Sequence, residues 1–227
     1  MTRSGFWVDP FSFTQKDINP EDFLSALYQS RAFGHWGAYS IMQHQLHVGQ
    51  HLTINDQPAL IVLAGMTHDF GEVYTADLIT HVRRNPMLRE YSEVIDRVQN
   101  DVNEWFGTKL SQADYAAVKD ADMAVLRAEL EELQPHWLPY AARNPRDPEV
   151  LAINSYAKAA LPRRVMSPAD VFRDYMDLYA ELWSKATAVD RAEVARAREA
   201  LAARPPFEAP PAPPPIVQPF HKLVRFV

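Results

Sequence analysis

The sequence contains no cysteine among its 227 residues. This absence excludes thiol nucleophiles, disulfides and cysteine-rich zinc sites, so any metal must be bound by histidine and carboxylate side chains. No apolar run approaches the roughly 18–20 residues that a membrane-spanning helix needs. The N-terminus also lacks the basic and then apolar pattern of a secretory signal. We therefore expect a cytoplasmic protein that does not insert into a membrane.

Positive charge is also scarce, since 23 lysines and arginines stand against 29 aspartates and glutamates, for a net charge of −6. This balance argues against broad binding to nucleic acids or acidic membranes, while it leaves room for a local basic pocket. Hydrophobic residues make up 47% of the chain and charged residues 23%, which is typical of a globular protein. The length allows one sizeable domain, or one domain with an appendage.

Apolar residues recur at helical spacing along most of the chain, and no convincing pair of alternating strands is visible. Helix start signals are clear, for example Asn19-Pro20 and Ser167-Pro168, and Gly107 is a helix-ending glycine. We therefore predict an all-α fold. The expected helices cover residues 19–28, 39–52, 59–72, 85–106, 111–133, 167–183 and 190–203.

Other segments do not have a helical pattern. Residues 1–19 are predicted to form an extended lead-in anchored by aromatic side chains, and the prolines of 135–148 indicate a loop. The chain has 18 prolines, eight of them between Pro205 and Pro219, which favours polyproline II or disorder there. The amphipathic end, 220–227, is either a free terminus or a segment docked on the body or on a neighbouring subunit. The lead-in anchors are Phe6, Trp7, Phe11 and Phe13.

These patterns predict three parts: a core over 1–140, helices over 141–203 that pack on it, and a proline-rich tail over 204–227. Within the core, residues 68–77 hold one histidine and three carboxylates in ten positions. His68, Asp69 and Glu72 would share one face of a helix, with Cβ atoms about 5–6 Å apart. A buried cluster of this kind needs charge compensation, and a divalent metal commonly provides it. The alternative is an acidic, solvated helix end.

Three further residues strengthen the metal interpretation. His44, the His68-Asp69 pair and Asp122 each lie in or beside an apolar stripe. Their order and context resemble the HD-domain metal-dependent phosphohydrolases, over about residues 4–137. Within this family the chain is most similar to the bacterial 5′-deoxynucleotidases and the phage dATP triphosphohydrolases. The matching segments are Tyr39-Ser40-Ile41-Met42-Gln43-His44-Gln45, residues 64–77, and Val118-Lys119-Asp120-Ala121-Asp122.

The resemblance implies a role for each residue of the cluster. One divalent transition metal, Co, Mn, Zn or Ni, would be held by two imidazoles and two carboxylates. Glu72 would act as the general acid and base. Asp77 would orient the attacking water or contact the sugar, its alternative role being a helix N-cap. The four metal ligands would be His44, His68, Asp69 and Asp122.

Substrate phosphates need cations, and the resemblance points to Arg83, with Arg84 next to it. Arg31 and His35 precede the His44 helix and could face the substrate, or serve a structural role. Trp36 is placed either to stack on a base or to pack in the core. Two more histidines share the face of His44. They would pack in the core, hydrogen-bond to the metal ligands, or bind a second metal. They are His47 and His51.

The function implied by the resemblance is hydrolysis of a small nucleotide, with no nucleic-acid partner. We favour a phage-type dATP or dNTP triphosphohydrolase that releases the deoxynucleoside, in the host cytoplasm if it is phage-encoded. The alternatives are a 5′-deoxynucleotidase acting on deoxynucleoside monophosphates, a hydrolase of cyclic nucleotides or an alarmone, and a non-catalytic metal-binding interaction module. The resemblance also implies a homo-oligomer, with the tail a candidate for the subunit interface.

Overall fold

The computed structural model describes residues 2–31, 39–160 and 165–185. Within these ranges the regular structure is helical and no β-strand forms, although one isolated antiparallel bridge joins Ser30 to Ser40. The predicted all-α class is therefore confirmed for the described part of the chain. None of the helices described there is long and apolar enough to cross a membrane.

Nine α-helices and three 3₁₀ helices follow one another in the described ranges. In chain order they are η1 (Gln15–Asp17), η2 (Pro20–Leu27), α1 (Ile41–Ile54), α2 (Ala59–Thr67), α3 (Glu72–Thr75), α4 (Thr80–Arg83), η3 (Pro86–Leu88), α5 (Arg89–Phe106), α6 (Gln112–Leu133), α7 (Trp137–Arg143), α8 (Pro148–Asn154) and α9 (Pro168–Lys185). The observed and predicted bounds agree well for α6, where the capping residue Ser111 precedes an apolar stripe.

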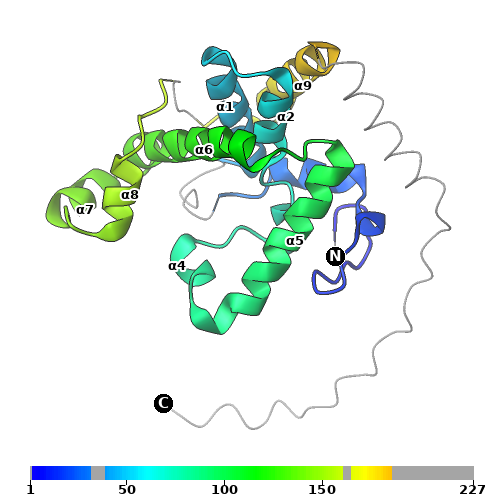
Figure 1. Cartoon of the computed structure of the whole chain (residues 1–227), viewed down its shortest axis with the longest axis horizontal. Helices are drawn as coiled ribbons and strands as arrows, with labels where there is room; N and C mark the ends of the chain where they lie inside the picture. The colour runs from blue at the N-terminus through cyan, green and yellow to red at the C-terminus, as the bar shows by residue number, and fades with distance from the viewer. Residues whose placement is uncertain (1, 32–38, 161–164, 186–227) are drawn as a thin grey trace, which may run out of the picture.

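The centre of the fold is the packing of α1 against α2, with α6 and α9 in contact with both (Figure 1). Leu46 and Met66 are fully buried in this core. Gly65 permits the close approach of α1 and α2, because a Cβ atom there would lie 2.4 Å from Cδ1 of Leu52. The packing brings His44 of α1 and the C-terminal end of α2 together.

The helix α6 begins, and α5 ends, where the sequence indicates, but the helix predicted over 85–106 is divided into η3 and an α5 that begins only at Arg89. Ser111 caps α6 by accepting a hydrogen bond from the backbone N–H of Asp114. Gly107 ends α5 in the left-handed conformation, with φ of 68°. Val98 and Val102 of α5 are fully buried, as their helical spacing predicts.

The prediction of a loop over 135–148 is wrong, because this segment contains α7 and the start of α8. Pro139 lies in the first turn of α7, where backbone N–H groups have no partner within the helix and proline costs little. Pro148 opens α8 in the same way, and Asp147 caps it by accepting from the N–H of Glu149. Both helices lie at the C-terminal end of α6 (Figure 1).

The lead-in differs from its prediction in two ways. Of its aromatic residues only Phe13 is buried, while Phe6, Trp7 and Phe11 are 63%, 81% and 61% exposed. Phe11 still contacts the ring of Tyr91, at 5.9 Å between centroids, so the predicted anchoring role is wrong for Phe6 and Trp7. The lead-in is also interrupted by η1, and its backbone is held by polar contacts instead. One of these is the hydrogen bond from the N–H of Ser4 to the buried carboxylate of Asp22, at 2.7 Å.

The C-terminal part is described only as far as α9. This helix packs on α1 and α2, and the hydroxyl of Tyr175 donates to the carbonyl of Met66 at 2.6 Å. The predicted core-covering role of this helix is therefore confirmed. The helix predicted over 190–203 and the tail over 204–227 lie outside the described residues.

Candidate metal centre

The turn between α2 and α3 carries the central pair of candidate residues. The helix expected to run without interruption over 59–72 instead ends at Thr67, and α3 begins at Glu72. Gln99 of α5 holds the turn from one side: its amide oxygen accepts from the N–H of Gly71 at 2.7 Å, and its amide nitrogen donates to the carbonyl of Thr67 at 3.1 Å. A side chain at residue 71 would collide with this contact, since a Cβ atom there would lie 2.7 Å from Oε1 of Gln99.

Gln45 of α1 holds the same turn from within the core. With its amide oxygen turned toward the backbone, it accepts from the N–H groups of Asp69 and Phe70, at 3.2 and 3.1 Å. Both glutamines replace hydrogen bonds that a continuous helix would have supplied. The turn therefore depends on two side chains that are distant in the sequence, and it directs His68 and Asp69 toward α1 and α6.

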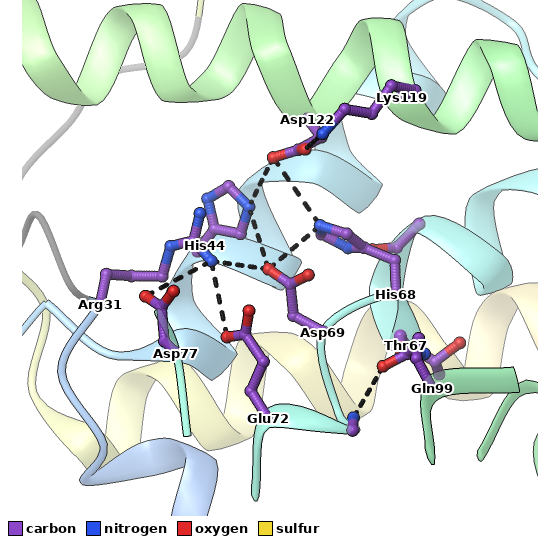
Figure 2. Close-up of polar contacts among 12 residues, drawn as sticks. Arg31, His44, Thr67, His68, Asp69, Glu72, Asp77, Gln99, Lys119 and Asp122 are labelled. Carbon is purple, nitrogen blue, oxygen red and sulfur yellow. Dashed lines mark hydrogen bonds and ion pairs between the residues drawn. The ribbon is translucent and has the colours of Figure 1, made fainter. Parts of the chain in front are cut away.

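His44, His68 and Asp122 meet in a buried group that could hold a metal ion (Figure 2). One potential ligand atom from each residue lies within 4.8 Å of the other two. Nε2 of His44 is 3.2 Å from Oδ1 of Asp122, and Nε2 of His68 is 3.8 Å from the same oxygen. Ligand atoms bound to one ion at about 2.0–2.2 Å would lie at similar separations.

The orientation of both imidazoles fits a metal. Nδ1 of His44 lies 2.7 Å from Oε1 of Glu129, and Nδ1 of His68 lies 2.7 Å from the carbonyl oxygen of Gly65. These acceptors favour a proton on each Nδ1 and leave a lone pair on each Nε2. Both Nε2 atoms are buried and make no hydrogen bond. Two unpartnered nitrogens that face shared carboxylates are the donor set that a divalent ion would satisfy.

Asp69 lies at the edge of this group and has a second partner. Its Oδ2 is 3.2 Å from Nε2 of His68 and 3.7 Å from Nε2 of His44. The same oxygen is 2.7 Å from Nη1 of Arg31. The structure therefore places Asp69 beside the two imidazoles, but with its nearest oxygen also engaged by a guanidinium.

Arg31 is buried among three carboxylates (Figure 2). Besides its contact with Asp69, its Nη1 lies 3.7 Å from Oε2 of Glu72 and 3.9 Å from Oδ2 of Asp77. Asp77 lies before α4, which begins at Thr80, and contributes to this ion-pair network. Arg31, which was predicted to contact substrate, therefore forms ion pairs with Glu72 and Asp77, which were predicted to act in catalysis.

The charges of the cluster shift the protonation of its members. Burial, and then the nearby charges of Asp69 and Asp77, raise the pKa of Glu72, while Arg31 opposes them. Burial opposes ionisation of Asp122, yet its contacts with the two imidazoles and Lys119 lower its pKa. A carboxyl with a raised pKa beside carboxylates that stay ionised is a common arrangement for acid–base chemistry.

A small cavity of about 110 Å³ opens on the cluster. It is lined by His68, Asp69, Glu72 and Asp122, together with the cationic side chains of Arg83 and Lys119. Arg83 forms an ion pair with Asp96, and Nζ of Lys119 lies 2.7 Å from Oδ2 of Asp122. His35 and Trp36, the other predicted substrate contacts, lie outside the described residues.

A larger cavity, of about 610 Å³, is lined mainly by aromatic and aliphatic side chains such as Phe23, Trp105 and Tyr175. No histidine or carboxylate lines it, so it lacks the kind of metal ligands that the small cavity has. The small cavity, in contrast, is lined by His68, Asp69, Glu72 and Asp122.

Glu129 belongs to this cluster, although the sequence analysis did not identify it. It lies seven residues after Asp122 on α6, which is two helical turns, so both side chains share one face. That spacing is the signal that could have found it. Glu129 is buried and also accepts a hydrogen bond from the hydroxyl of Tyr39, at 2.6 Å.

Metal affinity at this site should increase with pH above 6.5. Burial opposes protonation of both imidazoles, but the neighbouring carboxylates outweigh it and raise the pKa of His44 and of His68 above the usual 6.5. Ions bind the neutral imidazole, so protons compete with the metal until the pH exceeds these raised values. Calorimetric titration with Co²⁺ or Mn²⁺ at several pH values should show tighter binding and less proton release as pH rises. An affinity that is constant from pH 6 to 9 would contradict this assignment.

Comparison with known proteins adds no assignment to this site. The sequence matches none of the protein-family models and none of the curated proteins with which it was compared. The buried group of His44, His68 and Asp122 therefore stands on its own geometry, and the resemblance to HD-domain phosphohydrolases stays a prediction.

Proposed function

We propose that this protein is a metal-dependent phosphohydrolase of deoxynucleotides built on an HD-type helical scaffold. The observation that carries the proposal is the pair of buried, unpartnered Nε2 atoms of His44 and His68, which face Asp122 and lie beside Asp69. Two imidazoles with two carboxylates suit Co, Mn, Zn or Ni. The four side chains come from α1, from the end of α2 with its turn, and from α6, so the fold brings them together from distant parts of the sequence.

A bound divalent ion would polarise a phosphate oxygen and make water a stronger acid. The residues of the chain do the rest. Glu72 lies within the cluster, and its Oε2 is buried without a hydrogen-bond partner, so this oxygen is available to accept the proton of the attacking water. Because burial and the nearby carboxylates raise the pKa of Glu72, this carboxyl holds a proton more readily than an ordinary glutamate does and can pass it to the leaving oxygen. Asp69 and Asp77 both lie near Nη1 of Arg31, at 2.7 and 3.9 Å.

The dimensions of the cavity limit what it can enclose. At about 110 Å³ it is well below the roughly 300–1,000 Å³ of sites that enclose whole small molecules. The phosphate end of a nucleotide fits it, and Arg83 and Lys119 supply positive charge there. The sugar and base would then lie outside this cavity.

We favour a dATP or dNTP triphosphohydrolase that releases deoxynucleoside and triphosphate. One observation favours the alternative, a 5′-deoxynucleotidase. The two cations that line the cavity are both paired with carboxylates, Arg83 with Asp96 and Lys119 with Asp122. A monophosphate requires fewer cations than a triphosphate, so this limited positive charge suits the smaller substrate.

A substrate screen tests the proposal directly. The protein, loaded separately with Co²⁺, Mn²⁺, Zn²⁺ or Ni²⁺, is incubated with ribo- and deoxynucleoside mono- and triphosphates, and phosphate, triphosphate and nucleoside are measured. We expect turnover of a deoxynucleotide with at least one ion and none after chelation. Release of triphosphate supports the first activity, and release of phosphate from a monophosphate supports the second. A protein that binds the ions but hydrolyses no nucleotide would instead be a metal-binding interaction module.

A further inference from the structure

A buried chain of polar groups extends from His44 away from the other candidate ligands. Oε1 of Glu129 lies 2.7 Å from Nδ1 of His44 and accepts a hydrogen bond from the hydroxyl of Tyr39 at 2.6 Å. That hydroxyl is also 2.8 Å from Nδ1 of His47. All four side chains are buried. The proposed reaction uses neither Tyr39 nor Glu129, so their burial requires another explanation.

The costs of burial indicate what this chain does. Burying a carboxylate is expensive unless hydrogen bonds or charges compensate it. Glu129 is compensated by the imidazole of His44 and the phenol of Tyr39, both of which point at the same oxygen. An aspartate or glutamate behind a metal-binding histidine commonly fixes its ring orientation and makes it a stronger donor. Glu129 has this relation to His44.

The two imidazoles of the centre are oriented by different acceptors. His68 faces the carbonyl oxygen of Gly65, which is part of the backbone and cannot turn away. His44 faces a side chain, whose carboxyl group could rotate if nothing held it. The Tyr39 hydroxyl supplies that restraint, because its hydrogen bond ends on the same Oε1 that His44 contacts. Tyr39 lies directly before Ser40, the N-cap of α1, so the restraint is anchored at the start of the helix that carries His44.

We propose that Glu129 and Tyr39 are positioning residues that hold the His44 imidazole with its proton on Nδ1 and its Nε2 lone pair toward the metal. Glu129 sets the orientation of the ring, and Tyr39 sets the orientation of Glu129. This inference rests on the metal centre of the proposed function, but not on the reaction or on the substrate.

Metal affinity measured without any substrate tests the inference. The variants are Glu129→Gln, which keeps an oxygen acceptor but loses the charge, Glu129→Met, which loses both, and Tyr39→Phe. Co²⁺ is titrated against a chelating indicator, and the visible absorption spectrum of the bound ion is recorded. We expect affinity to fall by about 10–100-fold in Glu129→Met, and by less in Glu129→Gln and Tyr39→Phe. The Co²⁺ spectrum should change in Glu129→Met, because a reoriented imidazole alters the ligand field.

Tyr175→Phe is the matched control. It also removes a buried phenol that donates one hydrogen bond of 2.6 Å, in this case to the carbonyl of Met66. It should keep the affinity and the Co²⁺ spectrum of the unchanged protein, although Tyr39→Phe additionally loses the contact of its hydroxyl with His47. A loss of affinity in Tyr39→Phe no greater than in Tyr175→Phe would overturn the role of Tyr39.

The outcomes separate this inference from the proposed function. If the unchanged protein binds Co²⁺ and Glu129→Met binds it equally well with the same spectrum, the positioning role is wrong and the metal centre stands. If Glu129→Met does not fold, as judged by circular dichroism, Glu129→Gln and Tyr39→Phe decide the question, and unchanged affinity in both overturns the role. If the unchanged protein binds none of the four ions, the metal centre itself is wrong.

Discussion

Replacing Asp122 with asparagine should weaken metal binding by more than about 100-fold and abolish nucleotide hydrolysis. Oδ1 of Asp122 lies near both Nε2 atoms, at 3.2 and 3.8 Å, so this residue joins the two imidazoles into one site. Its pKa is lowered despite burial, which means that it stays ionised and supplies negative charge to the ion. Mutating a residue that only hydrogen-bonds to a metal ligand typically lowers metal affinity by about 10–100-fold. Mutating a direct ligand should lower it further. Metal content after dialysis and the rate of hydrolysis measure the two effects.

Asp120→Asn provides the control for this experiment. Asp120 lies on the same helix two residues earlier, but its side chain is exposed and does not line the small cavity. This variant should keep both metal and turnover. If Asp122→Asn retains a full equivalent of metal after dialysis, the buried group is not the binding site, and its unpartnered imidazoles need another explanation.

Replacing Glu72 with glutamine should lower the turnover rate by about 10²- to 10⁴-fold while leaving metal content unchanged. Glutamine has nearly the same shape but cannot accept the proton of the attacking water. Glu72 is not one of the three residues of the buried group, and its Oε2 lies 3.7 Å from Nη1 of Arg31, so the substitution should leave the two imidazoles and Asp122 in place. Measuring turnover and bound metal on the same sample separates a proton-transfer role from a ligand role.

The same variant should also affect stability in a direction that depends on pH. Because burial and Asp69 raise the pKa of Glu72, its ionised form is less favourable in the folded protein than in the unfolded chain. Glutamine does not ionise, so it changes stability little below the ordinary glutamate pKa of 4.5, removes a cost that grows from there to the raised pKa, and removes a constant cost above it. The melting temperature of Glu72→Gln should therefore exceed that of the unchanged protein increasingly as pH rises through that range. Glu90→Gln, at an exposed position of α5, should show neither effect. Full turnover in Glu72→Gln would refute the acid–base assignment.

The helices were predictable wherever local signals agreed. The Ser111 cap and the apolar stripe that follows it predicted α6, and Gly107 marked the end of α5. The break in the helix at residues 68–71 was not predictable, because the hydrogen bonds that support it come from Gln45 and Gln99 on other helices. The short helix α7 was missed because proline was taken as a breaker, although the first turn of a helix tolerates it.

In the candidate site, too, some residues were predictable from the sequence and others depend on the tertiary fold. His44, His68 and Asp122 lie in or beside apolar stripes, where a buried polar group requires compensation, and the resemblance to HD-domain phosphohydrolases implied that they are metal ligands. Glu129 was missed since Glu131 and Glu132 follow closely, and three glutamates within four residues resemble a solvated surface. The ion pair between Arg31 and Asp69 could not be anticipated either, because only the tertiary fold brings these residues together.

Gly65 bears two constraints at one position. Its missing side chain lets α2 approach Leu52 of α1, and its carbonyl oxygen orients the imidazole of His68. A mutation that moved this backbone to relieve crowding would also turn a candidate ligand, so stability and metal binding would change together. Natural variation at residue 65 should therefore be confined more tightly than at other core positions. Directed evolution for a more stable protein would have to begin elsewhere.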